Sequence, residues 1–204
     1  MYANGRTTGV VVDAGFRCSH VAAIIDGHVL KGATQRLDVG GEDVTERLGL
    51  MLDGRSAFPE ELQLTRTSLV EDFKRQRCHV PLNVYETARS WSTTGKDMFD
   101  VKQRFYRLPD KSMLDIGDEV FWAPECLFRP DLKGTKNASP DPAAELDKSL
   151  SAPGLTECVS MCMARCGDDL LRPLSRNIVM AGGGSLLPGK SITQHACVVR
   201  VTLN

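Results

Sequence analysis

Two short β-branched runs near the start of the chain alternate with polar turns. Thr8–Asp13 and Val21–Ile25 predict two strands, the second closed by Asp26-Gly27. Because so few residues separate these runs, they predict a hairpin with Phe16–His20 at its tip. Gln35–Val39 predicts a third strand. This part of the chain is therefore expected to form a sheet.

Helical spacing begins after the glycine pair Gly40-Gly41. Carboxylates follow in the first turn, where the helix dipole favours them, and the apolar positions then recur at Val44, Leu48, Met51 and Leu52. Glu60–Cys78 predicts a second helix. We interpret its basic stretch, Lys74-Arg75-Gln76-Arg77, as a solvated helix end rather than a nucleic-acid patch.

The middle of the chain alternates between strand and turn signals. Phe99–Leu108 and Met113–Phe121 predict two strands around the turn Pro109-Asp110. Ala123–Phe128 predicts a short helix, because a proline stands near its first turn.

The last third of the chain predicts a loop, a helix and a strand that ends in a run of glycines. Lys133–Ala152 is rich in Pro, Ser and Asp and predicts the loop, and Leu155–Arg165 predicts the helix. The strand Asn177–Ala181 then runs into Gly182–Gly184. A backbone this bare suits a phosphate cradle, a shelf for a nucleotide base or a simple turn.

Composition excludes several classes of function. Of 204 residues, 42% are apolar and 25% charged, as in soluble globular proteins. The formal net charge of −1 gives no global field for nucleic acid or an anionic membrane. No apolar run approaches the ~20 residues that span a bilayer, and no secretory leader is recognisable. Sequence-specific nucleic-acid binding and membrane insertion are therefore not expected.

Seven cysteines without a secretory leader indicate free thiols in a reducing compartment. Cys158, Cys162 and Cys166 are four residues apart, which stacks them along one helix face. A zinc site would need a fourth ligand, and neither a CxxC pair nor a nearby histidine supplies one. We expect buried thiols and no zinc.

Four segments, in the same order, resemble the second half of the actin superfamily. One is similar to its second phosphate-binding hairpin, two to the start and the end of its smaller lobe, and the last to its adenine-side loop. They are Thr7–Gly15, Arg36–Gly41, Phe121–Phe128 and Asn177–Gly189.

This resemblance implies an α/β fold, the ribonuclease-H-like large lobe of actin with a smaller α/β lobe inserted. Residues 1–39 and 131–189 would form the large-lobe part, and residues 40–130 the small-lobe part. Residues 135–150 resemble an insertion, and residues 190–204 a divergent tail. We expect the lobe to be incomplete at both ends, and so to expose apolar surface and require a partner.

The resemblance also implies a nucleotide site. Asp13 matches the acidic residue that faces a nucleotide-bound Mg²⁺ through water, and His20 the histidine that positions the attacking water, which makes His20 a weak catalytic candidate. The residues that match nucleotide-contacting positions are Asp13, Gly15, Gly41, Lys74, Gly182, Gly183, Leu186 and Leu187.

Three substitutions depart from the family at this site. Phe16 and Arg17 stand where conventional actins have Asp and Gly, and Arg75 replaces the acidic residue that accepts from the ribose. Phosphoryl transfer needs several groups to converge. Binding of ATP or ADP with Mg²⁺ is therefore expected to be weak or lost, and hydrolysis is not expected.

Further details are similar to divergent nuclear actin-related proteins, most of all to the subfamily of actin-related protein six. That resemblance implies a non-catalytic subunit of a chromatin-remodelling complex in the nucleus, with a remodelling ATPase and histones as partners. The alternatives are an ATP-hydrolysing cytoskeletal actin relative, a cytoplasmic dynactin-type scaffold, and a truncated fragment without function.

Overall fold

A mixed sheet lies at the centre of the fold. The computed structural model describes residues 1–55, 60–94, 105–135 and 152–189. Within them, five strands form the sheet: β1 (Gly9–Ala14), β2 (Ser19–Ile25), β3 (His28–Val29), β4 (Gln35–Leu37) and β7 (Ile178–Ala181). The order is β3-β2-β1-β7, and β4 also pairs with β2. β2 runs antiparallel to β1, whereas β7 runs parallel to it.

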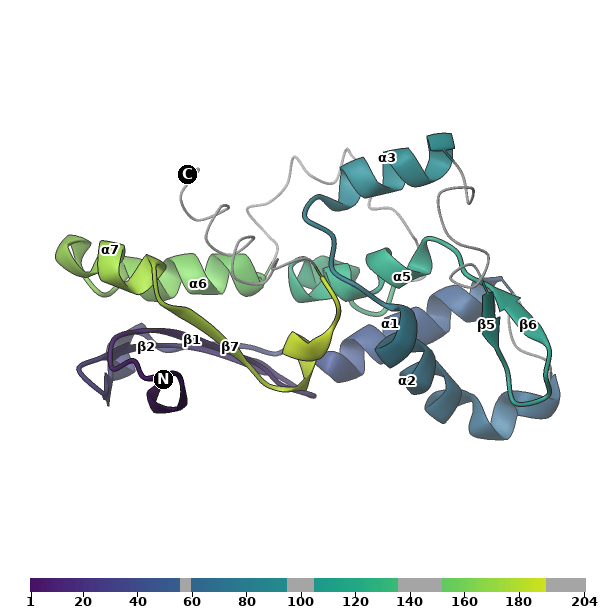
Figure 1. The fold of residues 1–204 in the computed structure, drawn as a ribbon, viewed down its shortest axis with the longest axis horizontal. Helices are drawn as coiled ribbons and strands as arrows, with labels where there is room; N and C mark the ends of the chain where they lie inside the picture. Colours follow the sequence, from purple (N-terminus) through teal and green to yellow (C-terminus); the bar gives the residue numbers. More distant parts are fainter. Residues whose placement is uncertain (56–59, 95–104, 136–151, 190–204) are drawn as a thin grey trace.

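One face of this sheet is buried under two helices. Val10, Val12 and Val21 are at most 1% exposed, and their alternation along β1 and β2 places them on the same face. α6 (Leu155–Ala164) contacts β1, β2 and β4, and α7 (Asp168–Ser175) contacts β1. Figure 1 shows α6 and α7 along the same side of the sheet. The apolar alternation thus directs this face into the core.

The opposite face of the sheet is only half-buried. It carries Val11 and Asp13 of β1, Ala22 of β2 and Val179 of β7. In the described part of the chain no α-helix lies along that side in Figure 1. Among the described residues, the sheet therefore has one face buried under helices and one face that is only half-buried.

The second group of elements lies beyond the carboxyl end of β7. It comprises α1 (Gly41–Gly54), α2 (Arg66–Arg77), α3 (Val84–Thr94), the antiparallel pair β5 (Phe105–Arg107) and β6 (Met113–Asp115), and α5 (Glu119–Trp122). Short 3-10 turns connect the elements: η1 (Tyr2–Asn4), η2 (Lys31–Ala33), η3 (Glu60–Thr65), η5 (Pro124–Leu127), η6 (Pro130–Leu132) and η8 (Gly183–Leu186). α1 packs on α2 and α5.

One apolar core joins the two groups. Leu48 and Leu52 of α1, Phe73 of α2 and Phe121 of α5 are fully buried. The ring of Phe73 meets that of Tyr106 edge to face, with centroids 5.0 Å apart. Burying aromatic side chains of this size is the main apolar stabilisation of this region.

Several predicted elements are confirmed within one to three residues. They are the hairpin strands, the third strand, the helix after Gly40-Gly41, the helix from Leu155 and the strand before the glycines. Asp26 (φ 50°) and Gly27 (φ 82°) both have left-handed backbones, as the predicted tight turn after β2 requires.

Other predictions are wrong in detail. His20 lies inside β2 rather than at the hairpin tip. The predicted strand Met113–Phe121 ends at Asp115, because the Gly117 N–H donates to Glu119 Oε1 at 2.9 Å and starts a helical turn. The predicted helix Glu60–Cys78 is a 3-10 turn followed by α2. The short helix predicted at Ala123–Phe128 is present as the 3-10 helix η5, with Pro124 at its start.

Among the described residues, the two longer helices that were not predicted are α3 and α7. α3 begins after Asn83, whose side-chain oxygen accepts from the N–H groups of Tyr85 and Glu86 at 3.1 and 3.2 Å. This Asn cap is a sequence signal that could have revealed α3. α7 contains Pro173, and proline disfavours a helix interior, so the sequence carries no clear helix signal there.

Parts of the predicted organisation stay untested. Residues 136–150 of the predicted insertion loop and the tail 190–204 lie outside the described residues, as does the start of the predicted strand Phe99–Leu108. The division into lobes at residues 40 and 130 stays a prediction.

Candidate functional site

A cavity of about 410 Å³ opens where the β1–β2 hairpin tip, the glycine loop after β7 and the helices α1 and α2 meet. Its lining combines bare backbone, apolar side chains and a few charges. The lining residues are Gly15, Phe16, Gly41, Val44, Glu71, Lys74, Arg75, Leu127, Gly183, Gly184, Leu186 and Leu187. Residues more than 170 positions apart thus share one wall.

The three glycines after β7 differ in why their positions require or tolerate glycine. Gly182 has φ +82°, and a Cβ there would overlap the Ala14 carbonyl and the Asp13 carboxylate. A Cβ on Gly184 would come within 2.9 Å of the Ala14 Cβ. A Cβ on Gly183 would meet nothing within 4 Å, so this glycine alone of the three faces open space. Two glycines serve packing against β1, and one leaves room in the cavity.

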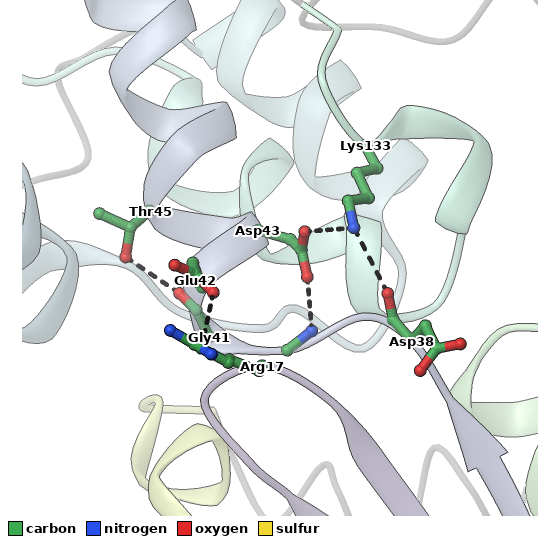
Figure 2. A network of polar contacts seen from close by, with 8 residues as sticks. Arg17, Asp38, Gly41, Glu42, Asp43, Thr45 and Lys133 are labelled. Carbon is green, nitrogen blue, oxygen red and sulfur yellow. Dashed lines mark hydrogen bonds and ion pairs between the residues drawn. The ribbon is translucent and has the colours of Figure 1, made fainter.

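The hairpin tip closes onto the start of α1. The Gly41 N–H donates to the Gly15 carbonyl at 3.0 Å, and the Glu42 N–H donates to the Phe16 carbonyl at 2.7 Å. Arg17 pairs with the Glu42 carboxylate at 3.6 Å (Figure 2). The first N–H groups of a helix are natural donors to an anion. Here two of them are already bonded to the protein's own backbone.

Lys74 is the buried cation of the cavity, with 8% of the residue exposed. Its ammonium donates to the Gly41 carbonyl at 2.9 Å and to Thr45 Oγ1 at 2.6 Å. Both acceptors are neutral, and no carboxylate of the described residues lies within ion-pair distance. Burial lowers the pKa of Lys74, and the nearby Glu71 carboxylate offsets part of that effect.

The rim of the cavity is apolar and basic. Phe16 is 55% exposed and Leu186 81% exposed, large fractions for side chains of this kind. The Lys74 ammonium stands 6.0 Å from the centre of the Phe16 ring, at the outer limit of a cation–π contact. Arg75 pairs with Glu71, one turn earlier on α2, at 2.5 Å. The Glu71 carboxylate that lines the cavity is therefore already in an ion pair.

Asp13 and His20 lie outside the cavity lining. They stand opposite each other on β1 and β2, and Arg36 of β4 stands opposite His20, so the three share the half-buried face of the sheet. Asp13 still approaches the glycine loop, because its carboxylate occupies the space beside Gly182. The predicted metal-facing residue Asp13 and the weak catalytic candidate His20 are therefore neighbours, but neither lines the cavity with Lys74.

The glycine loop is tied to the second group of elements. The Val80 N–H, just after α2, donates to the Pro188 carbonyl at 2.9 Å. η8 therefore spans from the end of β7 to the segment after α2 and forms one side of the cavity.

A second polar centre, formed by Asp43 and Lys133, lies at the first turn of α1, on the side away from the Lys74 cavity (Figure 2). Asp43 is buried, accepts from the Gly40 N–H at 2.8 Å and pairs with the Lys133 ammonium at 2.7 Å. Lys133 also donates to the Asp38 carbonyl at 3.4 Å. Asp43 thereby joins the chain that enters α1 to the segment after η6, and its pairing raises the pKa of Lys133.

The family model for actin matches residues 1–192. The chain belongs to the actin family. The predicted superfamily and the α/β actin-like fold are thereby confirmed, whereas the nuclear subfamily is not distinguished by this match.

The actin-family chain brings together six of the predicted nucleotide-contacting residues. They are Gly15, Gly41, Lys74, Gly183, Leu186 and Leu187. The remaining two, Asp13 and Gly182, contact each other behind this wall. Their role in binding ATP, ADP or Mg²⁺ stays a prediction.

Sequence reasoning missed four residues of the cavity wall, and it named two others, Phe16 and Arg75, there only as departures from the family. Gly184 adjoins the predicted Gly183, and Glu71 precedes Lys74 by three positions on α2, so helical spacing could have found Glu71. Val44 and Leu127 carried no signal beyond an apolar core position.

The cysteines of α6 lie in the core of this actin-family protein. Cys158 and Cys162 are buried, and Cys166 is half-buried. Burial raises the pKa of the Cys162 thiol to about 11, so it is protonated at neutral pH. Within the described ranges, no three His, Cys, Asp or Glu side chains are grouped to hold a metal ion. No described helix has both the length and the apolar character needed to cross a membrane.

Proposed function

We propose that this actin-family chain is a non-hydrolysing structural subunit of a larger protein assembly. The observation that carries the proposal is the closed hairpin tip. The Gly41 and Glu42 N–H groups are bonded to the hairpin's carbonyls, and the Glu42 carboxylate stands beside them. A phosphate would lose two donors there and meet a negative charge.

The positions of Asp13 and His20 support the same proposal. Neither residue lines the cavity that contains Lys74. Phosphoryl transfer depends on positioning a phosphate, a metal and a water together, so the separation of Asp13 and His20 from this cavity favours a structural role.

For the kind of assembly, we take the resemblance to nuclear actin-related proteins as the guide. The proposed assembly is a chromatin-remodelling complex that exchanges histone variants, and the chain's proposed partners are a remodelling ATPase and histones. Its proposed location is the nucleus.

Affinity purification of the tagged protein from its own cells tests the proposal. Remodelling-ATPase subunits and histones should co-purify, and Asp13→Ala in this chain should leave the ATP turnover of the purified assembly unchanged. Dynactin components or actin-binding proteins as the main partners would contradict the nuclear assignment. ATP turnover that Asp13→Ala abolishes would contradict the non-hydrolysing role.

A further inference from the structure

The charges that line the cavity between the hairpin tip and α2 favour a ligand with a carboxylate. Two cations, Lys74 and Arg75, line it together with one carboxylate, Glu71, which already pairs with Arg75. Lys74 is bonded to neutral oxygens only. A buried ammonium without an opposite charge is costly, so an added carboxylate would be favoured here.

The exposed apolar residues of the cavity also favour a ligand with a large apolar group. Phe16 and Leu186 are both well exposed and line the cavity from two different loops, the hairpin tip and η8. Val44, Leu127 and Leu187 line the wall with further apolar surface. A large apolar side chain placed between the two loops would remove this surface from water.

The start of α1 is a poor phosphate site. A phosphate there requires free N–H donors, whereas the Gly41 and Glu42 N–H groups are bonded to the carbonyls of Gly15 and Phe16. A carboxylate needs fewer donors and matches the ammonium of Lys74, which pairs with no carboxylate in the part of the chain that the structure describes.

We propose that this cavity is a docking site for an acidic, extended segment of a partner protein. A bulky apolar side chain of that segment enters between Phe16 and Leu186, and flanking Asp or Glu carboxylates lie against Lys74 and Arg75. The inference rests on the proposed role as an assembly subunit and states how the subunit is held.

Site-specific photo-crosslinking tests the inference in the full-length chain. Benzoylphenylalanine replaces Leu186 at the cavity mouth. The matched control places it at Leu64, which is 99% exposed on η3 and does not line the cavity. The cross-linked peptides are identified by mass spectrometry. The Leu186 position should cross-link to one partner segment with two or more acidic residues close to the linked apolar residue.

Charge reversal then separates a cavity site from a chance contact. Arg75→Glu leaves the buried Lys74 in place, and the cross-link yield from position 186 should fall about tenfold because like charges then face each other. Arg89→Glu on α3 is the control, since Arg89 is exposed and does not line the cavity, and it should leave the yield unchanged.

Three results would overturn the inference. The first is a cross-linked segment that is basic or uncharged, and the second is an equal effect of Arg75→Glu and Arg89→Glu. The third is loss of the cross-link on adding millimolar Mg-ADP, which would make the cavity a nucleotide site. If the assembly still co-purifies in these cases, the docking inference fails alone. If no assembly co-purifies, the proposed function fails with it.

Discussion

Two buried charges flank the first turn of α1, and only one of them is neutralised. Asp43 is matched by the Lys133 ammonium and by the Gly40 N–H. Lys74, on the cavity side of the same turn, is bonded to two neutral oxygens. Both groups are less than 10% exposed, so their difference lies in pairing and not in burial. The matched charge serves the fold, whereas the unmatched one is available to a ligand.

This difference predicts opposite results for removing the two charges. Breaking a matched buried pair leaves a charge or a donor unsatisfied. Removing an unmatched buried charge also removes the cost of its desolvation. Stability measurements on matched variants can therefore test whether the two centres differ as described.

The largest expected effect is at Asp43. Asp43→Ala leaves the Gly40 N–H without an acceptor and removes the partner of Lys133, so the free energy of unfolding should fall by about 2 kcal/mol. Urea denaturation followed by circular dichroism measures it. The control is Asp38→Ala, because Asp38 is exposed and its carboxylate pairs with the exposed Arg36. Equal losses in the two variants would contradict a structural role specific to Asp43.

A smaller effect is expected at Lys74. Lys74→Met keeps the length and apolar stem of the side chain and removes the buried ammonium. The lost hydrogen bonds and the relieved desolvation oppose each other, so the free energy of unfolding should change by less than about 1 kcal/mol. The same urea titration measures the change. A loss as large as that of Asp43→Ala would show that Lys74 is a structural residue.

The pH dependence of stability should differ in sign between the two lysines. Burial lowers the pKa of Lys74, so the unfolded state binds more protons between that lowered pKa and 10.5, and the Lys74 contribution to stability increases with pH there. The bond to Asp43 raises the pKa of Lys133, so its contribution is complete below 10.5 and is lost as pH rises through the raised value.

Unfolding free energies of the parent chain, Lys74→Met and Lys133→Met, measured from pH 8 to pH 11, isolate the two contributions. Relative to the parent, the Lys74 variant should lose stability with rising pH and the Lys133 variant should gain it. Parallel curves for the two variants would remove the distinction between the two centres.

The smallest effect is expected at Arg17. Its pair with Glu42 joins two exposed side chains 3.6 Å apart, and such pairs contribute little. Arg17→Ala should change the free energy of unfolding by less than about 0.5 kcal/mol, because the hairpin tip is held by backbone bonds to α1. A larger loss in the same assay would mean that the ion pair, rather than the backbone, closes the tip.

The sequence predicted the sheet better than the region beyond it. Alternating β-branched residues and the Asp26-Gly27 turn are local signals, and β1, β2 and the turn between β2 and β3 follow them. The helical turn at Glu119 depends on bonds to Gly117 and to Arg55, the latter 64 positions away. Local pattern could not reveal such distant partners.

The candidate site was predicted in part for a similar reason. The glycines and Lys74 could be assigned from their resemblance to actin-family segments. The closure of the hairpin tip on α1 could not, because it depends on two backbone bonds that have no side-chain signature. The pairing of Asp43 with Lys133 joins residues 90 positions apart and leaves no spacing pattern in the sequence.

The parallel pairing of β1 with β7 has a consequence for synthesis of the protein. Val10 pairs with Ile178, so one edge of β1 lacks its neighbour until the ribosome has added the intervening residues. At 5–20 residues per second, that interval lasts roughly 10–30 seconds. During this interval the nascent hairpin exposes an unpaired strand edge. Val10 and Val12 also stay exposed until the α6 and α7 segments, which cover them in the folded state, have been synthesised. Chaperone protection during translation is therefore expected to determine how much of this chain reaches its folded state.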